Sequence, residues 1–143
     1  MENHINIVSQ IIATLIPMIV GFLYYHPKVL GNTWMDANGF KMENMKPPKP
    51  VLYLLALVLS ALLAGFVHTN VTAPGQQTAP DGHSYITFQH GIAHGIVLTI
   101  FVVAPILGTM AIFEQKSLKW ALVNIGYWLV TLILMAGVLS AWR

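Results

Sequence analysis

Four long apolar stretches alternate with polar segments along the chain. They run approximately over residues 5–25, 51–69, 88–113 and 118–142. A helix of about 20 apolar residues crosses the roughly 30 Å of bilayer hydrocarbon. Lipid offers the backbone no hydrogen-bond partners, so each stretch must be helical. The pattern therefore predicts an all-α fold, an integral membrane four-helix up-and-down bundle, with one transmembrane domain over residues 1–143.

The composition supports a membrane location. Of the 143 residues, 56% are hydrophobic and only 8% are charged, whereas about a quarter of a soluble domain is charged. The chain has no cysteine, which excludes disulfides, thiolate metal sites and a cysteine nucleophile. Its net charge of +2 is small, so we expect the lipid bilayer as a partner and no nucleic acid.

The lysines predict the orientation of the bundle. Two loops carry them, at Lys28, Lys41, Lys46, Lys49, Lys116 and Lys119. Lysine-bearing short loops stay in the cytoplasm, so we expect both termini and the 70–87 loop outside. The first span begins with Glu2 and runs on without a small-residue cleavage site, so we expect it to be retained.

The first lysine-bearing loop is predicted to contain a short interfacial segment. Trp34 and Phe40 suit an anchor at the membrane surface, and Asn38-Gly39 suits a turn. The following "KPPKP" cannot be helical and should lead into the second span in an extended form.

Two segments of the chain resemble a known family. The stretch "GFLYYHPKVLGNTWM" has the pattern Y-x-P, a glycine and then W-M, and "WALVNIGYWLVTLILMAG" matches in the last span. The chain resembles a family of small four-span bacterial membrane proteins catalogued as a domain of unknown function. "HGIAHG" resembles the version found in Bacteroidetes-type members. The matching positions outside this version are Gly21, Tyr25, Pro27, Gly31, Trp34, Met35, Pro105, Phe113, Glu114, Asn124, Gly126, Tyr127 and Gly137. The resemblance implies a fold and a location in the bacterial cytoplasmic (inner) membrane, and it implies no activity.

The histidines are the residues that suggest chemistry. In a helix His90 and His94 lie one turn apart on one face, and two such imidazoles can ligate one ion. Small residues recur every four positions in the second span before His68, and Gly91 and Gly95 form a small pair in the third. We expect these small residues to bring the two spans together. The candidate metal ligands are therefore His68, His90 and His94, with His83, Asp81 or His4 as additional ligands, and zinc is a typical ion for three imidazoles.

Two other interpretations of these polar residues remain open. The histidines can be half-solvated residues at the membrane boundary, with Gly91 and Gly95 serving packing alone. Catalysis is not expected, because Gly91 stands where a zinc protease motif has its glutamate. Asn124 and Tyr127 are one turn apart in the last span and should face the bundle interior as structural residues.

The sequence thus predicts a membrane protein that is not an enzyme. The leading interpretation is a structural or interaction subunit that acts as a homo-oligomer or with other membrane proteins. The alternatives are a metal-binding protein built on the outer histidines, and a small-molecule carrier that works as an oligomer.

Overall fold

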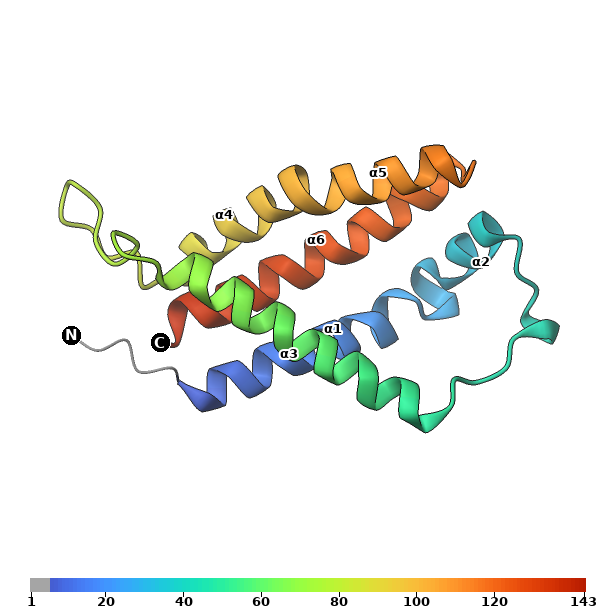
Figure 1. Cartoon of the computed structure of the whole chain (residues 1–143), viewed down its shortest axis with the longest axis horizontal. Coiled ribbons are helices and arrows are strands. Elements are labelled where there is room, and N and C mark those ends of the chain that lie inside the picture. Colours follow the sequence, from blue (N-terminus) through green and yellow to red (C-terminus); the bar gives the residue numbers. More distant parts are fainter. Residues whose placement is uncertain (1–5) are drawn as a thin grey trace.

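A computed structural model describes residues 6–143, which form helices and connecting loops. Four helices or helix pairs are long and apolar enough to cross a membrane: α1 (Ile7–Tyr24), α3 (Pro50–Thr72), the α4–α5 unit (Phe88–Phe113) and α6 (Leu118–Ala141). They run alternately up and down, so that α6 ends near the beginning of α1 (Figure 1). The predicted four-span helical fold is confirmed.

Helices α1, α4 and α6 begin where a side chain caps the first turn. The Asn6 side chain accepts hydrogen bonds from the amides of Val8 and Ser9, and the Ser117 hydroxyl accepts one from Trp120. Thr87 caps α4 in the same way. These side chains satisfy amide groups that the first turn of a helix leaves free. The predicted boundaries are therefore close, although α3 extends to Thr72 rather than Thr69.

The third span is interrupted in its middle. Helix α4 (Phe88–Leu98) passes into a π-helical turn, η3 (Thr99–Val103), and then into α5 (Ala104–Phe113). Pro105 lies just after this turn. Proline has no amide hydrogen and its ring clashes with the preceding turn, and a wider π turn accommodates both effects. The interruption of the span before Pro105 thus takes the form of a π-bulge.

A short helical segment follows the first span, as predicted. The π-helical turn η1 (Pro27–Gly31) leads into α2 (Asn32–Asn38), which ends at Gly39 in the left-handed region with φ of 69°. A 3-10 turn, η2 (Met42–Asn44), and an extended stretch then lead into α3. We call this end of the molecule the α2 end and the opposite end the Arg143 end.

Helix α6 is the centre of the bundle. It packs against α1, α3, α4 and α5, and it contributes Leu132, Met135, Ala136 and Leu139 to the buried core. The buried residues of α3 all lie in its second half, between Ala64 and Thr72. The first half of α3 diverges from α5 and α6 towards the α2 end (Figure 1). The bundle is therefore closed at the Arg143 end and open at the α2 end.

Glycines permit the closest helix contact, between α4 and α6. A Cβ atom on Gly95 would lie 2.7 Å from backbone atoms of Leu132 and Ile133, and one on Gly91 would collide with the carbonyl of Ala136. The prediction that these glycines pack the third span against the second is wrong. They face the fourth span, because α3 packs mainly on α1 and α6.

Candidate functional site

Several residues of the two segments that carry the family pattern come together at the α2 end. One set comes from the end of α1 and from α2, and the other comes from the first half of α6, about 100 positions later in the chain. We call this group the motif cluster; it consists of Tyr24, Tyr25, Trp34, Trp120, Asn124 and Tyr127.

Hydrogen bonds join the two halves of the motif cluster. The Tyr25 hydroxyl donates to Oδ1 of Asn124 at 3.0 Å, and the Asn124 amide donates to the Trp120 carbonyl at 2.8 Å. The Tyr24 hydroxyl donates to the Val123 carbonyl at 2.9 Å. The oxygen and the nitrogen of the half-buried Asn124 amide group thus both have hydrogen-bond partners within the fold.

Tyr127 makes a further link between α6 and α1. Its hydroxyl donates to the carbonyl of Pro17 at 2.8 Å. Its ring lies 5.2 Å from that of Tyr25, which in turn lies 5.4 Å from the Trp34 ring. Ring separations of this size are typical of aromatic pairs that stabilise a fold. Asn124 and Tyr127 therefore both make their contacts inside the bundle.

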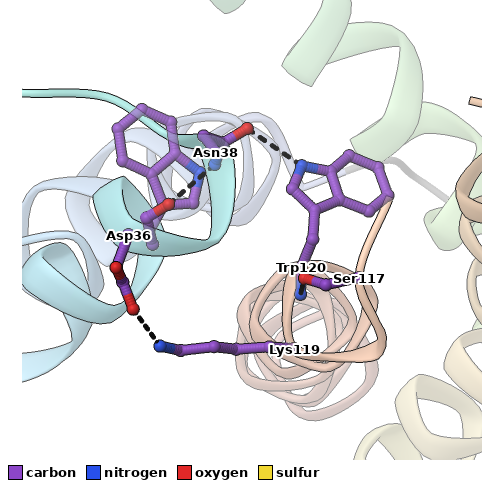
Figure 2. Close-up of polar contacts among 6 residues, drawn as sticks. Asp36, Asn38, Ser117, Lys119 and Trp120 are labelled. Carbon is purple, nitrogen blue, oxygen red and sulfur yellow. Dashed lines mark hydrogen bonds and ion pairs between the residues drawn. The ribbon is translucent and has the colours of Figure 1, made fainter. Parts of the chain in front are cut away.

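Helix α2 is fastened to the beginning of α6 by polar contacts (Figure 2). The Lys119 ammonium group pairs with the carboxylate of Asp36. The Trp120 indole donates to Oδ1 of Asn38 at 3.0 Å, and the Asn38 amide donates to the Trp34 carbonyl at 2.8 Å. The hydrogen bond and charge of Lys119 hold the pKa of Asp36 below its usual value.

At two positions of the family pattern, a residue larger than glycine would clash with neighbouring atoms. A Cβ on Gly31 would lie 2.9 Å from the carbonyl oxygen of His26, inside the π turn that follows α1. A Cβ on Gly126 would collide with the Tyr24 hydroxyl. Gly21 is less constrained, since a Cβ there would lie 3.8 Å from the Tyr127 ring. Trp34 and Met35, with Pro27 and Gly31, line a cavity of about 240 Å³ beside Tyr25.

The predicted metal ligands lie at the Arg143 end. The His90 and His94 rings meet edge to face with centroids 4.6 Å apart, and Tyr85 stacks on His90 at 4.6 Å. His68 is buried on α3. Nδ1 of His68 and Nε2 of His90 are buried and have no hydrogen-bond partner within residues 6–143.

Arg143 adds a positive charge at the same end of the bundle, and no pattern in the sequence connects it with the histidines. Its guanidinium group donates to the carbonyls of Val71 and Ser140, and it acts electrostatically on His68, His90 and His94. Burial lowers the pKa of Arg143 from its usual value. By the histidine cluster we mean the predicted ligands His68, His90 and His94 together with Arg143; within it, the rings of His90 and His94 are in contact.

The other proposed ligands do not join the histidine cluster. Asp81 and His83 pair with each other at 2.8 Å in the exposed loop before α4, and this hydrogen bond holds the pKa of Asp81 below its usual value. His4 lies outside the described residues. Within residues 6–143, no three histidine, aspartate or glutamate side chains are arranged to hold a metal ion. The metal site therefore stays a prediction.

Comparison with known proteins agrees with these observations at the level of the family. No curated protein and no solved structure matches the chain. Residues 8–140 match the family described as "Protein of unknown function (DUF1761)". This match includes all four spans and both halves of the motif cluster. The chain is thus a multi-pass membrane protein that belongs to the DUF1761 family.

Proposed function

We propose that the protein acts as a structural or interaction subunit of the membrane, as a homo-oligomer or within a larger membrane complex. The polar residues of the motif cluster support a structural role. Their hydrogen bonds join α1 and α6 to each other, so the family pattern maintains the architecture. Because these polar groups are used inside the fold, we expect the protein to act through its outer surface, in contact with other membrane proteins.

The observation that carries the proposal is the placement of two glycines. Most glycines in the spans lie close to another element, namely Gly21, Gly91, Gly95, Gly126 and Gly137. A Cβ on Gly65 or Gly108, in contrast, would meet nothing within 4 Å. Small residues on a lipid-facing surface let the helix of another chain approach closely. Gly65 on α3 and Gly108 on α5 therefore suit contact with a second copy.

The open side between α3 and α5 also suits such a contact. A cavity of about 220 Å³ there is lined by side chains of four elements, among them Leu63, Ile106 and Trp128. Helix α5 packs on α6 rather than on α3. A helix of a second copy seated on this side would contact Gly108 and the apolar residues around it.

The test is the mass of the protein in detergent and its crosslinking in the membrane. Gly65→Leu and Gly108→Leu are expected to shift the population towards monomers while the melting temperature of the monomer stays the same. Leu62→Ala, at a lipid-exposed position of α3, serves as the control. A wild-type protein that is monomeric both in detergent and in the membrane would contradict the homo-oligomer.

We also propose the orientation that the lysines predict, with loops 26–50 and 114–119 in the cytoplasm and both termini outside the bacterial inner membrane. Four antiparallel spans agree with termini on one side. A reporter fused after Lys46 should report a cytoplasmic position, and one fused after Gln77 an external one. The opposite pair of results would reverse the orientation.

A second candidate function is binding of a transition metal such as zinc by the histidine cluster. The buried, unpartnered nitrogens of His68 and His90 support this candidate, because neutral imidazole nitrogens are common zinc ligands. The guanidinium group of Arg143 opposes it, since a cation nearby repels a metal ion. We therefore rank it second.

Metal analysis of the purified protein separates the two candidates. If the histidines bind zinc, affinity should fall as the pH drops through about 6.5, where free imidazole protonates. His94→Ala should then remove most of the binding. His26→Ala is the control, because His26 lies in the turn after α1, where Nδ1 accepts from the Lys28 amide. Absence of bound metal at neutral pH, with zinc supplied, would leave only the structural role.

A further inference from the structure

A lateral groove lies on the other side of α3, between α1, α3 and α6. Its volume is about 460 Å³, within the range of small-molecule sites. Pro17 and Gly21 of α1 form one wall, Tyr53 and Ser60 of α3 the second, and Tyr127 with Trp128 of α6 the floor. The groove exists because the first half of α3 diverges from the bundle.

The groove is shorter than the hydrocarbon depth of one membrane leaflet. Tyr53 is in the first turn of α3 and Ser60 is seven positions further on, which corresponds to about 10 Å along the helix. The hydrocarbon of one leaflet is about 15 Å deep. A groove of this length along α3 is long enough to hold part of one acyl chain. Ala56 and Ser60, one turn apart, keep it open because their side chains are small.

Positive charge lies at the surface end of the groove. Lys49 caps the start of α3, and Lys46 precedes it in the extended stretch. The first turn of α3 contains no acidic residue. The acidic residue that precedes these lysines most closely in the chain is Glu43 in η2. A helix N-terminus with lysines beside it attracts phosphate groups.

We propose that this groove binds one acyl chain of an anionic phospholipid whose phosphate contacts Lys46 and Lys49. The apolar walls accept the chain, and the lysines with the start of α3 select the negative headgroup. Tyr53 lies at the level of the lipid glycerol, where tyrosine side chains are favourable. On α3 the groove is lined by other residues than the α3–α5 side proposed for a second copy, and Trp128 lines both.

The experiment is native mass spectrometry of the delipidated full chain with added phosphatidylglycerol or phosphatidylcholine. The wild-type protein should retain phosphatidylglycerol more strongly than phosphatidylcholine. Lys46→Gln with Lys49→Gln should reduce this preference on the order of tenfold. Lys116→Gln, in the other lysine-bearing loop, is the matched control and should leave the preference intact.

The groove itself is tested by filling it. Ser60→Phe and Ala56→Phe should each abolish retention of phosphatidylglycerol. Ala61→Phe, on the same helix but lining a different cavity, should not. A circular dichroism melt verifies that each variant is folded. If neither phenylalanine variant folds, the lysine variants test the proposal. Equal retention of both lipids by the wild-type protein would overturn the proposal, as would full retention by folded Ser60→Phe. Neither result depends on whether the protein forms an oligomer.

Discussion

Different interactions hold the helices together at the two ends of the bundle. At the Arg143 end, Gly91 and Gly95 bring the backbones of α4 and α6 into van der Waals contact, and a buried apolar core fills the space beside them. At the α2 end, hydroxyl, amide and indole groups join α1, α2 and α6, and α3 diverges. In a bilayer, neither end gains from the hydrophobic effect between helices, so packing and hydrogen bonds must suffice.

The difference indicates a division of tasks between the ends. Close backbone packing cannot adjust to a larger side chain, because even one added methyl group collides with main-chain atoms of the facing helix. A network of side-chain hydrogen bonds and rings can lose one member and keep the others. We therefore expect substitutions at the Arg143 end to act on the whole fold, and those at the α2 end to act locally.

The largest effect is expected for Gly91→Leu with Gly95→Leu. The added side chains must push α4 away from α6, and overpacking of this kind costs about 3 kcal/mol or more for two positions. The free energy of unfolding, measured in detergent, should fall by that amount. Leu62→Ala, at a lipid-exposed position of α3, is the control. An unchanged stability of the double variant would disprove the close α4–α6 contact.

A smaller effect is expected for Gly31→Ala. The added methyl group would lie 2.8 Å from the carbonyl carbon of His26, so the π turn must open to admit it. A cost of about 1–3 kcal/mol is typical of such strain. Thermal unfolding measures it, and Gly39→Ala provides a comparison in which strain comes only from the positive φ. Equal stability of Gly31→Ala and the wild type would contradict the crowding seen at this turn.

Tyr25→Phe should cost less still. The substitution removes the hydrogen bond to Asn124 and leaves the aromatic contacts of the ring in place. A buried hydrogen bond contributes about 1 kcal/mol, and those measured inside membranes average about 0.6 kcal/mol. The double variant with Asn124→Leu should lose less than the sum of the two single variants. Strict additivity would show that the two side chains do not interact.

The smallest effect is expected for the exposed contact between Asp36 and Lys119. Because the folded protein holds the pKa of Asp36 below its usual value, the pairing stabilises the docked α2 above about pH 4. This contribution is lost as the pH falls further through the folded pKa. Spin labels on cysteines introduced at Ala37 and Leu122 should report a broader distance distribution at low pH.

Asp36→Asn should show the broad distribution already at neutral pH, while global stability stays almost unchanged because exposed ion pairs contribute little. The chain has no native cysteine to interfere with labelling. A distribution that stays narrow in the variant would show that the Asn38–Trp120 hydrogen bond holds α2 without help from the ion pair.

The histidine cluster illustrates where reasoning from sequence stops. Spacing alone put His90 and His94 on one helical face, and their rings do lie together. The sequence did not indicate that Arg143 acts electrostatically on them, because no periodic pattern connects position 143 with positions 90 and 94. Likewise, the small residues predicted a close helix contact, but the predicted partner of Gly91 and Gly95, the second span, was wrong. Two apolar spans are equally good neighbours for a glycine until the other contacts are known.

The sequence by itself determined the four spans, the interfacial segment and the caps at which several helices begin. These features depend on local properties: apolar length, turn-forming residues and side chains that reach their own first turn. Only the tertiary structure decided which helices touch, that the motif residues of α1 and α6 form one hydrogen-bonded cluster, and that α3 leaves a groove on either side. Such contacts depend on side-chain shape across segments up to about 100 positions apart, which hydropathy and spacing do not encode.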